Sequence, residues 1–328
     1  MDSKTIPPDL RPPTREGVAG AAEKIAALLP PTPLLPLEIE GETVWCKAEC
    51  LQPIGAFKIR GAWNRLSELS AEERLRGVVG VSSGNHAQGV AWAARRLGIA
   101  ATIVMPRDAP RAKLDATRAL GAELVLYDRP GGDRDAIAAA LAAQSGATVV
   151  HAFGDPWVIE GQGSIGIELA AQFAERGIEG PSRIVAPCGG GGLSAGLALA
   201  CPGADIVPVE PAGWDDVRLS LAAGEIVPVA KDAPPTACDA LQTPSTRPIN
   251  FAVLKARCKF GLAVTETEVR AAQRLAFARL HLVVEPGGAA ALAAVLAGKV
   301  PIDRATAVVL SGGNTDAVTF ANVLTGID

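Results

Sequence analysis

The feature that most constrains the fold is a regular alternation of short apolar segments and amphipathic segments along residues 78–151. Repetition of strand, helix and strand places successive strands parallel to one another in one sheet. The expected strands are 78–82, 101–105, 123–127 and 148–151, and the expected helices between them are 86–97, 111–120 and 134–144. The sequence therefore predicts an α/β fold with a mostly parallel sheet.

A second series of helices and strands predicts a second sheet. Its expected elements are helices 159–176 and 193–200 and strands 182–186, 205–209 and 306–310, preceded by helices 16–29 and 57–66 and strand 43–48. A chain of 328 residues usually forms two domains. We expect a large domain of residues 1–75 and 151–328 and a small, mobile domain of residues 76–150.

Composition narrows the class of partner. The formal charge is −4 and no stretch concentrates Lys and Arg, which argues against both nucleic acid and a membrane surface as partners. The six cysteines lack paired spacing and the three histidines lie far apart, so neither zinc nor a disulfide framework is expected. The sequence has no apolar signal or membrane segment, which predicts a cytoplasmic protein that acts on a small molecule.

A run of four glycines predicts a phosphate-binding loop. An apolar strand at 184–186 leads into Gly189, Gly190, Gly191 and Gly192, and Leu193 opens an Ala- and Leu-rich helix. Backbone N–H groups of such a loop can converge on an anion, and the helix macrodipole adds attraction. The loop lacks both a clear dinucleotide fingerprint and the lysine of a P-loop. The alternative is a tight turn, which needs fewer glycines.

Lys58 stands in the segment Gly55-Ala56-Phe57-Lys58-Ile59-Arg60-Gly61. A lysine that forms a Schiff base has to be partly neutral, and burial among apolar groups and a nearby cation both lower the pKa of its amine. The segment provides that setting. The alternative is an ordinary surface lysine at the start of a helix.

Five segments, in order, resemble the motifs of one enzyme family. They are the segment 51–62 around Lys58, Ser82-Ser83-Gly84-Asn85-His86-Ala87-Gln88-Gly89, Gly161-Gln162-Gly163-Ser164, the four glycines, and Ser311-Gly312-Gly313-Asn314. Over about residues 30–320 the chain resembles serine/threonine dehydratases and serine racemases, the fold-type II pyridoxal-phosphate (PLP) enzymes. The resemblance implies two open, twisted, mostly parallel sheets flanked by helices, as in the tryptophan synthase β family, and a homodimer.

The resemblance also implies roles for individual residues. At the cofactor, Lys58 would form the Schiff base, Phe57 would pack beside the ring, Asn85 would bind the 3-hydroxyl, Ser311 would meet the pyridine nitrogen, and Gly189, Gly190, Gly191, Gly192 and Leu193 would hold the phosphate, with Glu285 and Asn314 at the same site. Ser82, Ser83, Gly84, Asn85 and His86 would present donors to the substrate carboxylate. The polar loops have an alternative interpretation as a helix cap and a turn after a strand.

The implied chemistry is β-elimination of a hydroxyl group from an amino acid. The neutral hydroxyl of Ser311 would not keep the pyridine nitrogen protonated, which disfavours long-lived carbanions. Lys58 would act as the base, and the departing hydroxyl would take its proton from the cofactor phosphate or from Lys58. Serine would give pyruvate and threonine 2-oxobutanoate, each with ammonia. Ser83 matches the acid–base serine of the family's racemases and permits a racemase side activity.

Two features bear on which β-hydroxy amino acid is used. Arg134 lies where the resembling racemases carry an arginine near the substrate entrance, and it could bind the second carboxylate of 3-hydroxyaspartate. The alternative is an exposed arginine at a helix start, paired with local acids. Gly154 stands where relatives usually carry Asn or Asp, with Trp157 close behind, so a wider pocket for a bulkier substrate such as phenylserine is a further hypothesis.

A cation site is a further implication of the resemblance. Glu210, the backbone carbonyl of Trp214, and Asp216 match a family loop that binds Mg²⁺ or Ca²⁺, and such ions prefer hard oxygen ligands. Relatives more often carry Ala at the position of Trp214. The alternative is a solvated acidic turn after a strand.

Three other functions compete with the dehydratase. A PLP enzyme that performs β-replacement would use the same lysine, but its motifs fit this sequence less well. An NAD-dependent oxidoreductase would use the glycines and leave Lys58 and Asn85 unexplained. A non-catalytic relative should have lost Lys58, which is present.

Overall fold

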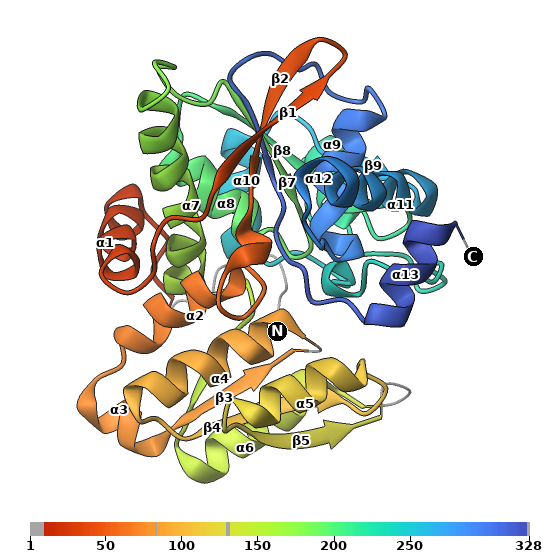
Figure 1. Cartoon of the computed structure of the whole chain (residues 1–328). Helices are drawn as coiled ribbons and strands as arrows, with labels where there is room; N and C mark the ends of the chain where they lie inside the picture. Colours follow the sequence, from red (N-terminus) through yellow and green to blue (C-terminus); the bar gives the residue numbers. More distant parts are fainter. Residues whose placement is uncertain (1–9, 83, 129–131, 327–328) are drawn as a thin grey trace.

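The computed structural model describes residues 10–82, 84–128 and 132–326. Within these residues the strands form a six-stranded sheet and a four-stranded sheet. Figure 1 shows the smaller sheet with its helices below the larger one, and helix α2 (Lys58–Ser67) between the two parts. The predicted α/β class with two mostly parallel sheets is confirmed.

The larger sheet has the strand order β1-β2-β10-β7-β8-β9 in the described part of the chain. β1 is antiparallel to β2, and the other neighbouring pairs are parallel. The strands are β1 (Leu34–Ile39), β2 (Glu42–Lys47), β7 (Arg183–Pro187), β8 (Asp205–Pro211), β9 (Leu262–Val264) and β10 (Thr306–Val309). The sequence did not predict β9 or β1. β1 contains Pro36 and lies at an edge of the sheet, where a residue without an N–H group is tolerated.

The smaller sheet is parallel throughout its described strands, in the order β5-β4-β3-β6. Its strands are β3 (Val78–Val81), β4 (Ala101–Pro106), β5 (Glu123–Tyr127) and β6 (Thr148–Val150). These strands all lie between residues 76 and 150, and the division of the chain into two domains stays a prediction.

Local signals in the sequence set the helix ends. The Thr14 side chain caps α1, and Asp155 caps α7 with Pro156 in its first turn. Capping boxes open α3 and α11. Besides α2, the α-helices of the described chain are α1 (Arg15–Ala26), α3 (Ala71–Arg76), α4 (Asn85–Leu97), α5 (Arg111–Ala119), α6 (Arg134–Ser145), α7 (Pro156–Ala174), α8 (Gly192–Ala200), α9 (Asp216–Ala223), α10 (Pro248–Arg257), α11 (Glu266–Leu275), α12 (Pro286–Leu296) and α13 (Ala317–Thr325). Three short helical segments accompany them: the 3-10 helices η1 (Glu49–Leu51) and η2 (Asp239–Leu241), and the π-helix η3 (Ala276–Leu280).

Helix α2 crosses α7 at a contact between two glycines. A Cβ atom on Gly161 would lie 2.6 Å from the Cα of Gly61 and 2.7 Å from the carbonyl oxygen of Arg60. Real Cβ atoms do not approach other atoms so closely, so both positions need glycine for the helices to touch. The Gly161 motif therefore has a packing role, which is to hold the helix that begins at Lys58 against α7.

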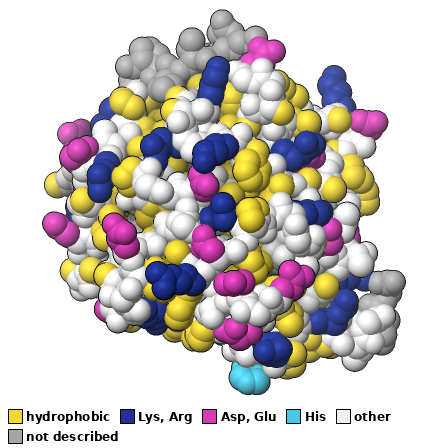
Figure 2. Space-filling model, turned by 90° about the horizontal axis from the view of Figure 1, so that it is seen from above, with side chains coloured by type: hydrophobic (Ala, Val, Ile, Leu, Met, Phe, Trp, Pro, Cys, Tyr) yellow, Lys and Arg dark blue, Asp and Glu magenta, His cyan; other side chains and the backbone are white. Residues whose placement is uncertain are grey.

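The surface carries charges of both signs. Figure 2 shows acidic and basic side chains intermixed over the face seen from above. Within the residues that the structure describes, no helix has the length and apolar character needed to cross a membrane.

Candidate active site

A cavity of about 250 Å³ lies between the two sheets, at the carboxyl ends of parallel strands. Ligands bind at this edge in open α/β sheets. Its wall includes most of the sequence-predicted residues that the structure describes, namely Phe57, Lys58, Ser82, Gly84, Asn85, His86, Arg134, Gly189, Gly190, Gly191, Gly192, Leu193 and Ser311. The predicted residue Ser83 lies outside the described residues.

Lys58 is the first residue of α2, and its amine faces the cavity. The Nζ atom donates a hydrogen bond to the carbonyl oxygen of Ala152 at 2.8 Å and lies 5.1 Å from the centroid of the Phe57 ring. Burial lowers the pKa of Lys58 to about 8. The amine can therefore shed its proton near neutral pH, as a nucleophile or a base must.

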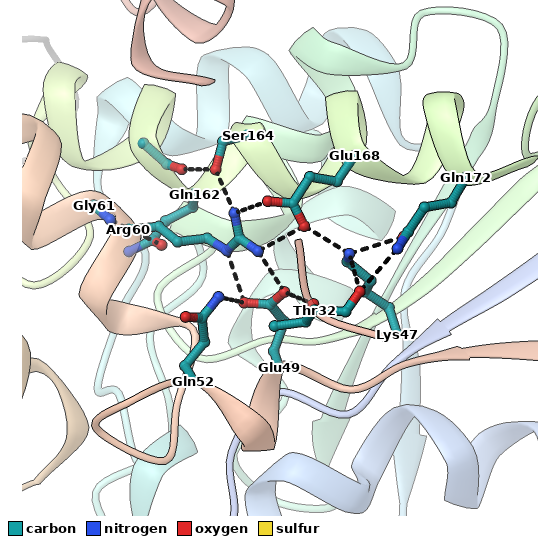
Figure 3. Close-up of polar contacts among 11 residues, drawn as sticks. Thr32, Lys47, Glu49, Gln52, Arg60, Gly61, Gln162, Ser164, Glu168 and Gln172 are labelled. Atoms are coloured by element: carbon teal, nitrogen blue, oxygen red, sulfur yellow. Dashed lines mark hydrogen bonds and ion pairs between the residues drawn. The ribbon is translucent and has the colours of Figure 1, made fainter. Parts of the chain in front are cut away.

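Arg60 does not contribute to that low pKa, contrary to the prediction that a nearby cation would help. Its guanidinium lies in a buried network behind α2, where it donates to Glu49 and Glu168 (Figure 3). All five of its N–H groups are used, because Ser164 accepts the fifth at 3.1 Å. Lys47 also donates to Glu168, at 2.6 Å. The network joins η1, α2 and α7 around the segment that carries Lys58.

The lysine segment pairs with the Ser311 loop, which is far away in the sequence. The N–H of Phe57 donates to the carbonyl of Ser311 at 3.0 Å, and the N–H of Gly313 donates to the carbonyl of Gly55 at 2.8 Å. Ala56 and Gly312 form an antiparallel bridge between these bonds. Gly55 has a φ of +71°, and a Cβ atom there would collide with Asn314. Backbone pairing thus fixes Lys58 relative to Ser311.

A polar cluster closes the cavity behind Asn85. The amide of Asn85 donates to Glu285, and its oxygen accepts a hydrogen bond from Asn314 at 2.9 Å. Lys113 donates to Asp239 at 2.7 Å and lies 3.4 Å from Glu285. Burial raises the pKa of Glu285, and Lys113 opposes that shift. Glu285 and Asn314 therefore contact the predicted site indirectly, through their hydrogen bonds to Asn85.

Lys113 and Asp239 line the cavity, although sequence reasoning missed both. Lys113 belongs to α5, which follows β4, and Asp239 belongs to η2 beside the larger sheet. Their ion pair therefore links the two sheets across the site. The position of Lys113 just beyond the carboxyl end of a predicted parallel strand was the signal that could have found it.

The four glycines form a cradle at the start of α8. Gly191 has a φ of +88° and is the residue before the helix, whose first N–H groups have no partner inside the helix. A Cβ atom on Gly190 would collide with the ring of Phe153, and one on Gly191 would lie 2.7 Å from Leu254. The fit of the loop against its neighbours thus requires glycine, and the helix start can accept an anion.

His86 is neutral and buried at the start of α4. Its Nε2 lies 3.1 Å from the carbonyl oxygen of Val150, so this nitrogen carries the proton and donates. Burial, with Lys58 nearby, lowers the pKa of His86 to about 3. Its Nδ1 has no hydrogen-bond partner among the described residues. The ring thus offers a free acceptor beside the cavity.

The predicted cation ligands lie apart from the cavity wall. Glu210 and Asp216 are buried, and their carboxyl groups interact. Burial raises the pKa of both groups, to about 7 for Asp216. One oxygen of Asp216 accepts the N–H of Thr246 at 2.7 Å, and the other has no partner among the described residues. The indole N–H of Trp214 donates to Pro234 at 2.7 Å.

These two carboxylates alone do not form a dense cluster of metal ligands. Across the described residues, no group of three or more His, Cys, Asp or Glu side chains could hold a metal ion. A cation at this place would therefore depend on backbone carbonyl oxygens as well.

Two mostly parallel sheets with flanking helices meet over a glycine cradle and a lysine of lowered pKa. These features define an enzyme that can hold a phosphorylated carbonyl cofactor. The family model described as "Pyridoxal-phosphate dependent enzyme" matches residues 25–312. The chain belongs to this family, as the five motifs predicted.

Similar proteins include enzymes of two activities. The chain is 36% identical to a serine racemase of Schizosaccharomyces pombe, covering 95% of this chain and 97% of that protein. It is 39% identical to an L-threo-3-hydroxyaspartate ammonia-lyase of a Pseudomonas species, covering 94% and 98% of the two chains. The crystal structure of a threonine deaminase from T.th. matches with a TM-score of 0.85 and 42% identity, over 93% of this chain and 99% of that one.

Proposed function

We propose that this protein is a PLP-dependent ammonia-lyase that converts a β-hydroxy amino acid, L-threonine or L-serine in the first instance, into a 2-oxo acid and ammonia. The observation that supports it most is the amine of Lys58, with its lowered pKa, in the same cavity as the glycine cradle. In the net reaction the β-hydroxyl leaves with a proton from Cα, and the water released is consumed when ammonia is freed. The names of similar ammonia-lyases agree with this assignment.

The residues present fit the cofactor. The start of α8 would hold its phosphate, Lys58 would bind its aldehyde carbon, Phe57 would pack beside its ring, and Ser311 would face the ring nitrogen. Bound PLP supplies an electron-accepting ring that makes the Cα proton of an attached amino acid acidic. The hydroxyl of Ser311, unlike a carboxylate, leaves that ring a modest electron acceptor, which suits rapid loss of a leaving group.

Lys58 and the start of α4 would handle the substrate. Lys58 would take the Cα proton of the substrate, since burial keeps the pKa of its amine low. The start of α4, at Gly84, Asn85 and His86, would bind the α-carboxylate, because these residues line the cavity at a helix N-terminus. Asn85, held by Glu285 and Asn314, would bind the cofactor's ring hydroxyl.

Racemisation is the second candidate function. It needs an acid–base group on the face opposite Lys58, and Ser83 is the residue that the family resemblance assigns to it. The similarity to serine racemases supports a side activity of this kind. Chiral chromatography of unreacted serine during turnover would detect it.

We further propose that residues 76–150 form a small domain that moves as a unit over the cavity. The Lys113–Asp239 pair is an ionic contact between the two sheets and would open when this domain moves. The six cysteines are free and buried, which suits the reducing cytoplasm. A homodimer is proposed on the family resemblance.

Cofactor capture by Lys58 is expected to depend on pH. Only the neutral amine attacks an aldehyde, and a pKa of about 8 leaves roughly a tenth of Lys58 neutral at pH 7. We expect the rate at which cofactor-free protein regains its visible absorbance band on adding PLP to rise up to about pH 8 and then level off. The rate at which PLP reacts with the side-chain amine of Nα-acetyllysine, measured at the same pH values, corrects for titration of PLP. A rate still climbing steeply above pH 9 would contradict the lowered pKa.

We propose that Glu210 and Asp216, with the Trp214 carbonyl, bind Mg²⁺ or Ca²⁺ in a structural role. Glu210 and Asp216 are buried and interact with each other, and one oxygen of Asp216 is without a partner among the described residues. We expect added Ca²⁺ or Mg²⁺ to raise the Tm by about 3–6 °C over protein in EDTA. Asp216→Asn should lose this response, whereas the exposed Asp128→Asn should keep it. An equal rise in Tm in both variants would show that the cation does not bind at Glu210 and Asp216.

The function is tested by a visible spectrum followed by 2-oxo acid release in the same sample. L-serine, L-threonine, L-threo-3-hydroxyaspartate and phenylserine are the substrates to compare. A visible band with 2-oxo acid from one of them supports the ammonia-lyase. A band without 2-oxo acid points to racemase or β-replacement activity, and no band after addition of PLP overturns the proposal.

A further inference from the structure

The outer end of the cavity carries two arginines that share one acid. Arg247 immediately precedes α10, and its guanidinium lies 3.1 Å from the carboxylate of Asp135 on α6. Arg134 lies 4.0 Å from the same carboxylate. All three residues line the cavity that contains Lys58, and the side chains are 37% (Arg134), 51% (Asp135) and 49% (Arg247) exposed. The group is therefore built into the site and remains open to a ligand.

Gly154 makes room for Arg247. A Cβ atom on Gly154 would lie 3.0 Å from the Cγ of Arg247 and 3.1 Å from the Nδ1 of His151. A larger side chain at this position would push the arginine stem away. The unusual glycine was expected to widen the pocket, but the space beside it is filled by the stem of Arg247. The lack of a side chain at Gly154 thus admits a cation from another segment.

The charges at this end do not cancel. Among the described residues of the cavity wall, Lys58, Lys113, Arg134 and Arg247 are basic, whereas Asp135 and Asp239 are acidic. Lys113 is already paired with Asp239. His151 adds no further positive charge, because burial foremost, and then Arg247, lower its pKa to about 3 and keep the ring neutral. Within the described cavity wall, the two guanidiniums thus share the single carboxylate of Asp135.

We propose that Arg247 binds an anionic group on the substrate side chain, so that the enzyme prefers β-hydroxy amino acids carrying a second carboxylate. This inference rests on the proposed ammonia-lyase function and refines its substrate: within that function it places β-hydroxy amino acids with a second carboxylate ahead of L-threonine and L-serine. The substrate carboxylate would take the place of Asp135, whose exposed ion pair is weak and easily exchanged. A planar guanidinium can bind such a carboxylate through two parallel hydrogen bonds.

The first test compares kcat/KM for L-threo-3-hydroxyaspartate with kcat/KM for L-serine. We expect Arg247→Gln to lower this ratio ~10- to 100-fold, as loss of a charge-assisted contact does. Asp135→Asn, which removes the competing acid, should raise the ratio. Gly154→Val, which displaces the arginine stem without removing its charge, should lower it. Arg257→Gln is the matched control, because Arg257 is the last residue of α10 and lies outside the cavity wall, and it should leave the kcat/KM ratio unchanged.

The second test measures binding without elimination. L-aspartate and L-alanine differ by one carboxylate and neither has a β-hydroxyl, so calorimetry with the holoenzyme should show tighter binding of L-aspartate and loss of that advantage in Arg247→Gln. If no substrate releases a 2-oxo acid yet this difference in binding is seen, the ammonia-lyase fails and the recognition of a second carboxylate stands. If L-serine is converted and neither the ratio nor the difference in binding changes in Arg247→Gln, the role of Arg247 is overturned and the ammonia-lyase stands.

Discussion

In Lys58→Ala we expect no visible band from covalently bound cofactor and a fall in 2-oxo acid release on the order of 10⁴-fold or more. The variant removes both the amine that would hold the cofactor and the base that would take the Cα proton. The readouts are the absorbance spectrum after gel filtration and single-turnover product release. The fold should be kept, because alanine replaces a side chain whose charged form is disfavoured by burial.

Lys113→Gln is the matched control for this variant. Lys113 is a second lysine in the same cavity wall, but its amine is engaged by Asp239 and Glu285, so we expect the visible band to persist. A band retained in Lys58→Ala and lost in Lys113→Gln would reassign the cofactor lysine. Circular dichroism of both variants separates loss of the cofactor from loss of the fold.

Arg60→Met is expected to lower the free energy of unfolding by about 3–5 kcal/mol. In the native chain Arg60 donates to Glu49 at 2.8 Å and to Glu168 at 2.6 Å, all within a buried network (Figure 3). Methionine fills much of the same volume but leaves the two carboxylates with Lys47 as the remaining cation of that network. Urea unfolding at fixed PLP concentration measures the loss.

The pH dependence of that loss identifies its cause. With Arg60 present, burial raises the pKa of Glu49, but the guanidinium, together with Lys47 and Thr32, brings that pKa below its usual value. In Arg60→Met the pKa of the stranded carboxyl should instead lie above its unfolded value, so protonation favours the folded state and the loss should shrink from pH 8 to pH 5. Arg60→Lys, which keeps the charge but has fewer donors, should lose less. A loss below about 1 kcal/mol in Arg60→Met would mean that the network contributes specificity rather than stability.

The elements that the sequence predicted each depend on their own periodicity, whereas helices α3 and α9 to α13 were not predicted. Helix 86–97, for example, corresponds to α4 (Asn85–Leu97). The position of β10 between β2 and β7 could not be predicted, since strand order depends on contacts between distant segments. β1 was missed because Pro36 is typical of a turn unless the strand is known to lie at an edge.

The candidate site likewise has residues that the sequence could predict and residues that it could not. Lys58, Asn85 and the four glycines stand in motifs that are continuous in the sequence, and the structure brings them together. Lys113 and Arg247 are single residues whose partners lie in other segments, so no local pattern marks them. A fold is needed before such a pair can be seen.

The middle of the larger sheet is completed by a late part of the chain. β10 inserts between β2 and β7, and the loop after it pairs with the segment before Lys58. During synthesis on the ribosome, therefore, β2 and β7 keep unpaired edges until residues 306–309 have emerged. We expect folding to be slow and post-translational, with the unfinished sheet a target for chaperones.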